Sequence, residues 1–470
     1  MRYISTRGEA PELSFCDVML TGLASDGGLY MPREWPSFSK ADIAAMRGLS
    51  YSELAVRLLR PFVGGEIDDT TFERIVNEAY STFAHGAVCP LVQLDTNRFV
   101  LELFHGPTLA FKDVAMQLIG RLIDHVLTER GERAVIVAAT SGDTGGAAIE
   151  AFAGRERADI FVLFPHNRVS PVQQRQMTTS TSANVHAIAV EGNFDDCQSL
   201  VKAMFSDRDF RTSVNLSGVN SINWARIMAQ IVYYFSSALS LGAPERAVSF
   251  AVPTGNFGDV FAGYAAKRMG LDIERLVIAT NENDILVRAL ESGEYRMRGV
   301  VPTTSPSMDI QVSSNFERLL FEASDRDSGQ VKRAMDGLKQ SGGFFIDPAA
   351  LERIRADFGA CRSTVTETAD MIGAILKRSG YLLDPHTATA VRATARKASE
   401  SGTPMVVLGT AHPSKFPDVV KEASGIYPNL PEAARFILDR QEKFEILPAE
   451  LKSIETFILE RSRASAEVPA

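Results

Sequence analysis

The most regular hydrophobic pattern in the chain lies between residues 112 and 131. Apolar side chains recur there at intervals of three and four, which predicts an amphipathic helix that stops at Arg130-Gly131. Residues 134–138 form an uninterrupted apolar run, which predicts a buried strand, and a glycine-rich turn leads to a second helix expected from about Ala147. The apolar positions of the first helix are Val114, Ala115, Leu118, Ile119, Leu122, Ile123, Val126 and Leu127.

Further short apolar runs predict strands, mostly with helical patterns between them. They lie at residues 160–164, 185–190, 248–252, 275–280 and 405–409. Such alternation favours a parallel sheet covered by helices on both faces, which is the α/β class. Residues 1–95 carry mixed helical patterns and are expected to form an N-terminal subdomain. Residues 282–385 look mostly helical, with a loop-rich stretch near 300–314, and are expected to be an insertion.

The size and composition of the chain indicate a globular protein with more than one core. At 470 residues, two or three packed subdomains are expected. Apolar residues make up 45% and charged residues 23%. The net charge is −9, and residues of both signs are well mixed along the chain. This balance argues against nucleic acid or an anionic membrane as the main partner, but it allows a local basic pocket for a small anion.

Cysteine usage and the lack of long apolar segments indicate a cytoplasmic protein. The four cysteines are far apart and form no CxxC pair, so neither a disulfide framework nor a metal site is predicted. The first residues lack the apolar core of a secretory signal, and no stretch approaches 18 apolar residues.

The segment LELFHGPTLAFKD at residues 101–113 places Lys112 where the first helix begins. A helix N-terminus is electropositive and disfavours an ammonium ion, and burial has the same effect. Both favour the neutral amine that a Schiff base requires. The alternative is a solvated lysine in the first helical turn, the usual place of this residue type.

Two glycine-rich segments connect predicted strands to helices: ATSGDTGG at 139–146 and VPTGNFGD at 252–259. Glycines let the backbone approach a ligand closely, and the free N–H groups at a helix start favour anions. Neither segment matches the dinucleotide or P-loop patterns. One such turn often does no more than redirect the chain, whereas two of them together with Lys112 form a more specific combination.

These motifs together resemble the longer branch of the threonine synthase family. The order and spacing of HGPT at 105–108, FKD at 111–113, TSGDTG at 140–145 and GNFGD at 255–259 are similar to that family. The resemblance runs from YISTRG at 3–8 to TAHP at 410–413 and so covers nearly the whole chain. It implies the tryptophan-synthase-like, fold-type II architecture, with a smaller α/β subdomain at about 135–215. The remainder of residues 96–470 would form a larger α/β subdomain that carries the insertion.

The resemblance also implies pyridoxal 5′-phosphate (PLP) as the cofactor and assigns roles in binding it. Lys112 would form the internal aldimine and act as the catalytic base, and Thr410 would face the pyridine nitrogen. An aspartate at 143 would repel the ring phenolate unless one of the two is protonated, because like charges disfavour each other. The PLP phosphate would be held by Gly255, Asn256, Phe257, Gly258 and Asp259, and the ring and substrate carboxylate by Ser141, Gly142, Asp143 and Thr144.

The implied substrate, O-phosphohomoserine, carries a phosphate that needs a cationic pocket of its own. Asn223 and Arg226 are the candidates, because positions i and i+3 share one helical face and arginine suits bidentate phosphate binding. The alternative for Arg226 is an ordinary surface ion pair. Lys415 is a second candidate for this pocket. His105 and His412 are either contacts of cofactor or substrate or hydrogen-bonded structural histidines.

The implied reaction converts O-phosphohomoserine and water into threonine and phosphate, by γ-elimination followed by addition of water at Cβ. A threonine-synthase-like phospholyase would share the motifs but release 2-oxobutyrate and phosphate. A PLP-free binding protein is a third possibility, which the presence of the lysine and both glycine loops disfavours. The sequence leaves the oligomeric state open.

Overall fold

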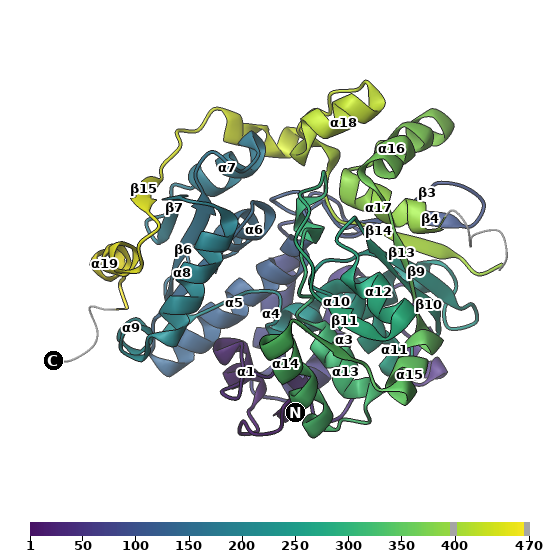
Figure 1. Cartoon of the computed structure of the whole chain (residues 1–470), viewed down its shortest axis with the longest axis horizontal. Helices are drawn as coiled ribbons and strands as arrows, with labels where there is room; N and C mark the ends of the chain where they lie inside the picture. Colours follow the sequence, from purple (N-terminus) through teal and green to yellow (C-terminus); the bar gives the residue numbers. More distant parts are fainter. Residues whose placement is uncertain (395–401, 465–470) are drawn as a thin grey trace.

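The computed structural model describes residues 1–394 and 402–464, which form two α/β halves side by side (Figure 1). The larger half contains a six-stranded sheet in the order β13-β10-β9-β14-β4-β3, parallel except for β3 at its edge. Its strands are β3 (Leu91–Gln93), β4 (Arg98–Glu102), β9 (Val248–Pro253), β10 (Ile273–Thr280), β13 (Phe358–Arg362) and β14 (Met405–Gly409).

The smaller half contains a five-stranded, fully parallel sheet in the order β15-β7-β6-β5-β8. Its strands are β5 (Ala134–Ala139), β6 (Ala158–Pro165), β7 (Val185–Glu191), β8 (Leu216–Ser217) and β15 (Glu445–Pro448). The α/β class predicted from the sequence is confirmed, and all six predicted strands are present, as β5, β6, β7, β9, β10 and β14.

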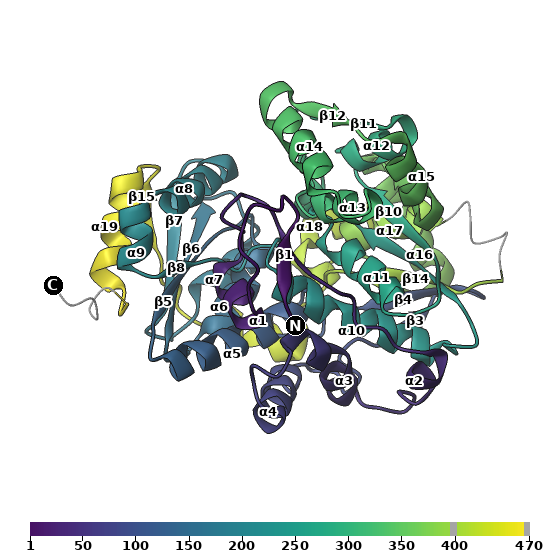
Figure 2. The ribbon, with the colours of Figure 1, turned by 90° about the horizontal axis from the view of Figure 1, so that it is seen from below.

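Helices cover both sheets (Figures 1 and 2). Those associated with the smaller half are α5 (Lys112–Arg130), α6 (Asp143–Phe152), α7 (Pro171–Thr178), α8 (Phe194–Ser206), α9 (Arg208–Ser213) and α19 (Leu451–Arg461). Those of the larger half are α10 (Trp224–Ser240), α11 (Gly258–Arg268), α12 (Ile285–Ser292), α13 (Phe316–Ala323), α14 (Ser328–Ser341), α15 (Pro348–Asp357), α16 (Val365–Ser379), α17 (Pro385–Thr394) and α18 (Pro417–Ser424).

The N-terminal residues form a short antiparallel ribbon and four helices that lie across the underside of both halves (Figure 2). Helix α3 packs against α10, and α4 against α5, so this segment contacts elements of both halves. The elements are β1 (Tyr3–Ser5), β2 (Tyr30–Pro32), α1 (Phe15–Thr21), α2 (Lys40–Ala44), α3 (Tyr51–Val63) and α4 (Asp69–Tyr80).

The region expected as a helical insertion contains helices α12 to α16, but it also supplies strands. Strands β11 (Glu294–Arg296) and β12 (Gly343–Phe345) form a two-stranded antiparallel sheet, and β13 pairs with β10 at the edge of the larger sheet. The described residues also contain the 3-10 helices η1 (Pro306–Met308), η2 (Pro413–Lys415) and η3 (Glu432–Leu438). In the two described ranges, no helix is both long and apolar enough to cross a membrane.

The end of the predicted helix before the first strand was located correctly, whereas the start of the helix after that strand was placed too late. Helix α5 ends at Arg130, and Gly131 adopts the left-handed φ of 66° that closes it, as expected. Helix α6 begins at Asp143, earlier than Ala147, so Gly145 and Gly146 lie inside it. The hydroxyl of Thr140 accepts hydrogen bonds from the N–H groups of Gly142 and Gly145, which stabilises this early start.

Candidate active site

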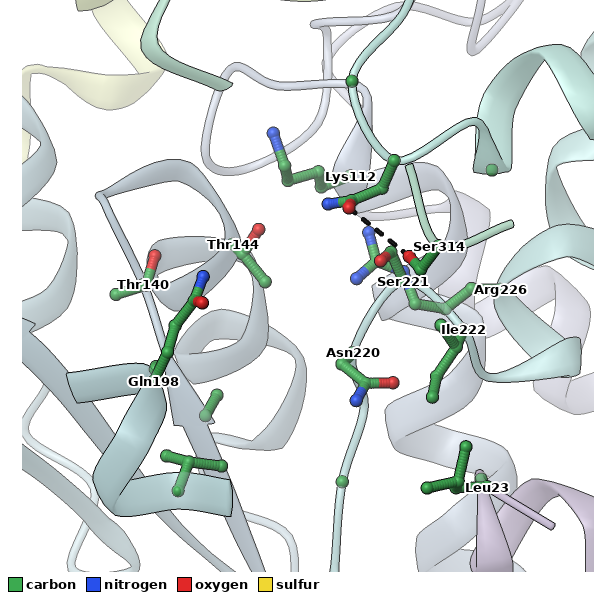
Figure 3. A pocket seen from close by; sticks show the side chains of 18 of the residues that line it. Leu23, Lys112, Thr140, Thr144, Gln198, Asn220, Ser221, Ile222, Arg226 and Ser314 are labelled. Carbon is green, nitrogen blue, oxygen red and sulfur yellow. Dashed lines mark hydrogen bonds between the residues drawn. The ribbon is translucent and has the colours of Figure 1, made fainter. Parts of the chain in front are cut away.

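A cavity of about 1840 Å³ lies where the carboxyl ends of the two sheets face each other. Residues that follow β5, β9 and β14 line it, which is where open α/β sheets place ligands. Figure 3 shows side chains converging from both halves. Thr140, Thr144 and Gln198 come from the smaller half, Asn220 and Ser221 from the loop that leads into α10, and Arg226 from α10 itself. The cavity therefore collects both glycine-rich segments and Lys112 at one place.

Lys112 is the first residue of α5 and is buried, with 8% of its surface exposed. The preceding backbone is fixed by the Ala110–Ala411 bridge and by a 2.9 Å hydrogen bond from Phe111 N to Thr410 O. Burial lowers the pKa of Lys112, Asp143 opposes this effect, and Arg226 and Lys415 add to it. The alternative of a solvated surface lysine is therefore wrong.

Asp143 begins α6 and lies between two lysines. Its Oδ2 is 3.4 Å from Lys112 Nζ, and its Oδ1 is 3.2 Å from Lys415 Nζ. Gln173 Nε2 also donates to Oδ1, at 2.8 Å. Burial by itself would raise the pKa of Asp143, but Lys415, Lys112 and the Gln173 hydrogen bond together hold it well below its ordinary value. The carboxyl group is therefore ionised at neutral pH.

The segment 255–259 forms a tight turn between β9 and α11. Phe257 has a left-handed φ of 65° at the start of the helix, and a Cβ on Gly255 would lie 2.5 Å from Ser307 O. The carbonyl of Gly255 is occupied, because Ser313 Oγ donates to it at 2.6 Å. No hydrogen bond within the described ranges uses the N–H groups of Phe257, Gly258 or Asp259. This turn is thus a helix N-terminus with donors available to an anion.

Asp259 anchors this turn to α10. Its Oδ1 accepts hydrogen bonds from the hydroxyls of Tyr233 and Tyr234, the latter at 3.1 Å. Burial raises the pKa of Asp259 to about 6, against the two tyrosine hydrogen bonds. Its Oδ2 is buried without a hydrogen-bond partner among the described residues.

Arg226 is a buried cation on the wall of the cavity, with 4% of its surface exposed. Its Nη1 donates to Val219 O at 3.2 Å, and its Nε is buried without a partner in the part of the chain that the structure describes. Gln230, one helical turn further on, also lines the cavity, and its Oε1 has no hydrogen-bond partner among the described residues. Burial lowers the pKa of Arg226 to about 10. The alternative of a surface ion pair is wrong for this residue.

Asn223 does not reach the cavity, so the expected pairing of Asn223 with Arg226 in a phosphate pocket is not what the structure shows. Asn223 is the N-cap of α10: its Oδ1 accepts from Ala225 N at 3.0 Å, and its Nδ2 donates to Met19 O at 2.8 Å. Its backbone is extended, so the helical i, i+3 rule does not apply to it. Asn220 and Ser221, from the preceding loop, line the cavity beside Arg226 instead (Figure 3).

Ser141, Thr144 and Thr410 all line the cavity, as expected from the sequence. Thr410 is held through its backbone, because its N–H donates to Thr387 Oγ1 at 3.2 Å; no hydrogen bond in the described ranges uses its hydroxyl. Gly142 does not line the cavity. Its φ is 137°, and a Cβ at this position would lie 2.3 Å from the Gln173 side chain, so the turn itself requires glycine here.

A buried polar cluster behind Thr410 was missed at the sequence level. Asp384 Oδ1 lies 3.0 Å from His386 Nδ1, and Asp384 Oδ2 accepts from Thr387 Oγ1. Ser307 N donates to His386 Nε2 at 3.3 Å, so the ring proton resides on Nδ1 and points to Asp384. His386 lines the cavity. The string DPHT at 384–387, a polar cap directly before an apolar helix, was the available signal.

Three other candidates lie outside the cavity lining. Lys415 Nζ is directed to Asp143 and to protein acceptors rather than to the cavity. His105 Nε2 pairs with Glu102 at 2.7 Å, and His412 Nδ1 pairs with Ser414 Oγ at 2.7 Å. The structural interpretation of both histidines therefore fits their positions.

Comparison with known proteins identifies the family to which this fold belongs. Residues 89–352 match the family described as pyridoxal-phosphate dependent enzyme, so the chain is a PLP-dependent enzyme of fold type II. The flanking residues match the families described as threonine synthase N terminus (residues 2–80) and threonine synthase, C-terminal (residues 387–458). The chain belongs to the threonine synthase family.

Individual relatives agree over nearly full length. Threonine synthase of Pseudomonas aeruginosa is 54% identical, covering 97% of this chain and 98% of the relative. The crystal structure of PLP-bound threonine synthase from Brucella melitensis has a TM-score of 0.97 and 65% identity, covering 99% of this chain and 100% of that one. Threonine synthase-like 2 of Xenopus laevis is 34% identical over 92% of each chain. The synthase-like alternative is therefore not favoured.

The residues of the cavity fit PLP, whose reactive parts are an aldehyde, a phosphate and a ring nitrogen. A buried primary amine, Lys112, suits the aldehyde. The available N–H groups at the start of α11 suit the phosphate, and the unused hydroxyl of Thr410 suits the nitrogen. Among the described residues, no group of three or more His, Cys, Asp or Glu side chains is arranged to hold a metal ion.

Proposed function

We propose that the enzyme converts O-phosphohomoserine and water into threonine and phosphate, with PLP attached to Lys112. The observation that supports this most directly is the presence of two separate anion sites in one cavity. The start of α11 offers backbone donors, and the wall formed by α10 offers the buried Nε of Arg226, which has no hydrogen-bond partner among the described residues. A phosphorylated cofactor and a phosphorylated substrate together require two such sites.

The bound cofactor supplies an electron sink for carbanions at the substrate carbons, and the protein supplies orientation and proton transfer. Lys112 is the base in this proposal, because its buried amine is less basic than that of an exposed lysine. It takes the proton from the substrate Cα and returns protons to substrate carbons that lie further from the carboxylate. Ser141 and Thr144 hold the substrate carboxylate, and the N–H groups of residues 255–259 hold the cofactor phosphate.

Arg226 is proposed to bind the substrate phosphate together with Asn220 and Ser221. The guanidinium is fixed by Val219 O on one side, and its buried Nε is available on the other. Phosphate departs during the reaction, so a cation at this position also stabilises the leaving group. Burial within the cavity strengthens this interaction, because fewer water molecules compete for the anion.

The test is product analysis. Purified, PLP-loaded enzyme is incubated with O-phosphohomoserine, and threonine, phosphate and 2-oxobutyrate are all quantified. The proposal expects threonine and phosphate in equal amounts. Accumulation of 2-oxobutyrate in place of threonine, or no turnover by protein that carries PLP, would refute it.

The cytoplasm is the proposed location of this reaction. Cys16, Cys89, Cys197 and Cys361 are all free thiols, the state that a reducing compartment maintains.

A further inference from the structure

Lys415 is a fully buried cation at the contact between the two halves. It ends η2, which follows β14 of the larger sheet, and none of its surface is exposed. Its Nζ donates to Thr108 O at 2.7 Å and to Gln176 Oε1 at 2.6 Å, and lies 3.2 Å from Asp143 Oδ1. The ammonium group thus has two hydrogen-bond acceptors, Thr108 of the larger half and Gln176 of the smaller half, and an ion-pair partner, Asp143 of the smaller half. A buried lysine kept charged in this way requires a counter-charge, and Asp143 is that group.

Each carboxylate oxygen of Asp143 faces a different lysine. Lys415 and Gln173 occupy Oδ1, whereas Lys112 faces Oδ2 at 3.4 Å. Burial raises the pKa of Asp143, and the charges of Lys415 and then Lys112 contribute most to lowering it. Other charged or titratable groups also act on these residues: His386 on Asp143, and Arg226 and Asp259 on Lys112. Lys415 in turn interacts with Asp113 and His412.

We propose that Lys415 is a positioning residue that acts on Lys112 through Asp143. By holding one carboxylate oxygen, Lys415 prevents Asp143 from forming an exclusive ion pair with Lys112. The amine of Lys112 then remains easily deprotonated, as attachment of PLP and proton transfer both require. A second cation on Asp143 also offsets the repulsion expected between this carboxylate and the cofactor's phenolate. The inference rests on the proposed attachment of PLP to Lys112.

The first test is the pH dependence of the visible absorbance of the PLP-loaded enzyme, from about pH 6 to about pH 10, a range that spans lysine-linked titrations in proteins. Lys415→Met leaves Lys112 as the lysine that pairs with Asp143 and should move the spectral transition upward by about one pH unit or more. Lys415→Arg keeps the charge and should restore a transition near that of the wild type. Lys421→Met, at an exposed lysine of α18, is the matched control and should leave the transition unchanged.

A double-mutant cycle with Asp143→Asn separates this role from a purely structural one. If Lys415 acts through the charge of Asp143, Lys415→Met should shift the transition only when Asp143 is present. If Lys415 merely packs against Thr108 and Gln176, its removal should have the same effect in both backgrounds. Equal effects, or an unshifted transition in Lys415→Met, would overturn the inference.

Two further outcomes are distinguishable. Wild-type protein without a visible PLP band would contradict the proposed function itself, whereas a normal band with no Lys415 effect contradicts only this inference. If Lys415→Met does not yield folded protein, Lys415→Gln carries the same test, because it removes the charge but retains a hydrogen-bond donor for Thr108 O.

Discussion

Lys112 Nζ and Asp143 Oδ2 lie 3.4 Å apart, although 31 positions separate them in the sequence. Each residue is the first of a helix, α5 and α6 respectively, and the two helices pack against each other. The helix starts therefore bring a buried amine and a buried carboxylate to the same end of the cavity. Burial lowers the pKa of the amine, and Asp143 partly offsets this effect while accepting a hydrogen bond from it.

Lys112→Ala should abolish turnover but retain PLP, because residues 255–259 are proposed to bind the cofactor phosphate independently of the lysine. Lys112→Arg should be equally inactive, since a guanidinium stays protonated and forms no imine. Borohydride reduction of wild-type enzyme should fix PLP on the peptide that contains Lys112, as located by mass spectrometry. An adduct on another lysine, such as Lys267 or Lys415, would overturn the assignment.

Gly255→Ala should weaken PLP binding, because the new Cβ would lie 2.5 Å from Ser307 O, which is rigid backbone. Displacement of the turn by such overpacking typically costs about 1–3 kcal/mol. The Kd for PLP, measured by fluorescence titration, should therefore rise by roughly fivefold to more than a hundredfold at 1.4 kcal/mol per decade. Gly86→Ala is the control, since nothing lies within 4 Å of its Cβ position. An unchanged Kd in Gly255→Ala would show that the turn does not hold the phosphate.

The sequence predicted the strands whose side chains are buried on both faces. All eight residues of β6 are buried, for example, and such strands appear in the sequence as continuous apolar runs. Strands β4 and β15 were missed because β4 begins with Arg98 and ends with Glu102, and β15 is a short, largely exposed edge strand that returns from far along the chain. Edge positions and charged strand ends weaken the hydrophobic pattern.

The site was predictable where its residues lie in one motif at a strand end, as Lys112 and the segment 255–259 do. It was not predictable where a side chain's direction depends on tertiary contacts. Asn223 and Arg226 share a helical face only if both are helical, and Asn223 is instead an extended cap. Lys415 meets Asp143 only because the two halves close on each other, which sequence spacing cannot express.

Asn223→Ala should destabilise the protein without changing substrate recognition. Loss of the N-cap typically costs about 1 kcal/mol, and leaving Met19 O unpaired adds about 1–3 kcal/mol. Urea unfolding should thus show a loss of about 2–4 kcal/mol, while kcat/KM of the folded enzyme stays near that of the wild type. A stable variant with strongly reduced kcat/KM would instead indicate that Asn223 binds the substrate.

His412 should make the protein sensitive to mild acid. Burial lowers the pKa of His412 to about 4, against the opposing charge of Glu102, whereas the unfolded chain has the ordinary value of 6.5. Between these two values the unfolded state binds more protons, so the free energy of unfolding falls as the pH decreases from about 6.5 to about 4. His412→Gln should reduce this fall in urea titrations at several pH values, and His85→Gln, at an exposed histidine, should not. Parallel pH profiles for all three proteins would contradict the assignment.

Arg226→Ala should weaken the use of O-phosphohomoserine while PLP remains bound. The arginine is buried in the cavity wall, and within the described ranges its Nε has no hydrogen-bond partner. A lost charge-assisted contact in such a site costs on the order of 2–5 kcal/mol. The value of kcat/KM should therefore fall by roughly 30-fold or more, at 1.4 kcal/mol per decade. The visible PLP absorbance should persist, which separates substrate binding from cofactor loss. Arg57→Ala, at an exposed arginine on α3, is the control and should retain wild-type kinetics. If folded, PLP-loaded Arg226→Ala has an unchanged kcat/KM, the substrate phosphate lies elsewhere in the cavity, and Asn220 and Ser221 lose their proposed role with it.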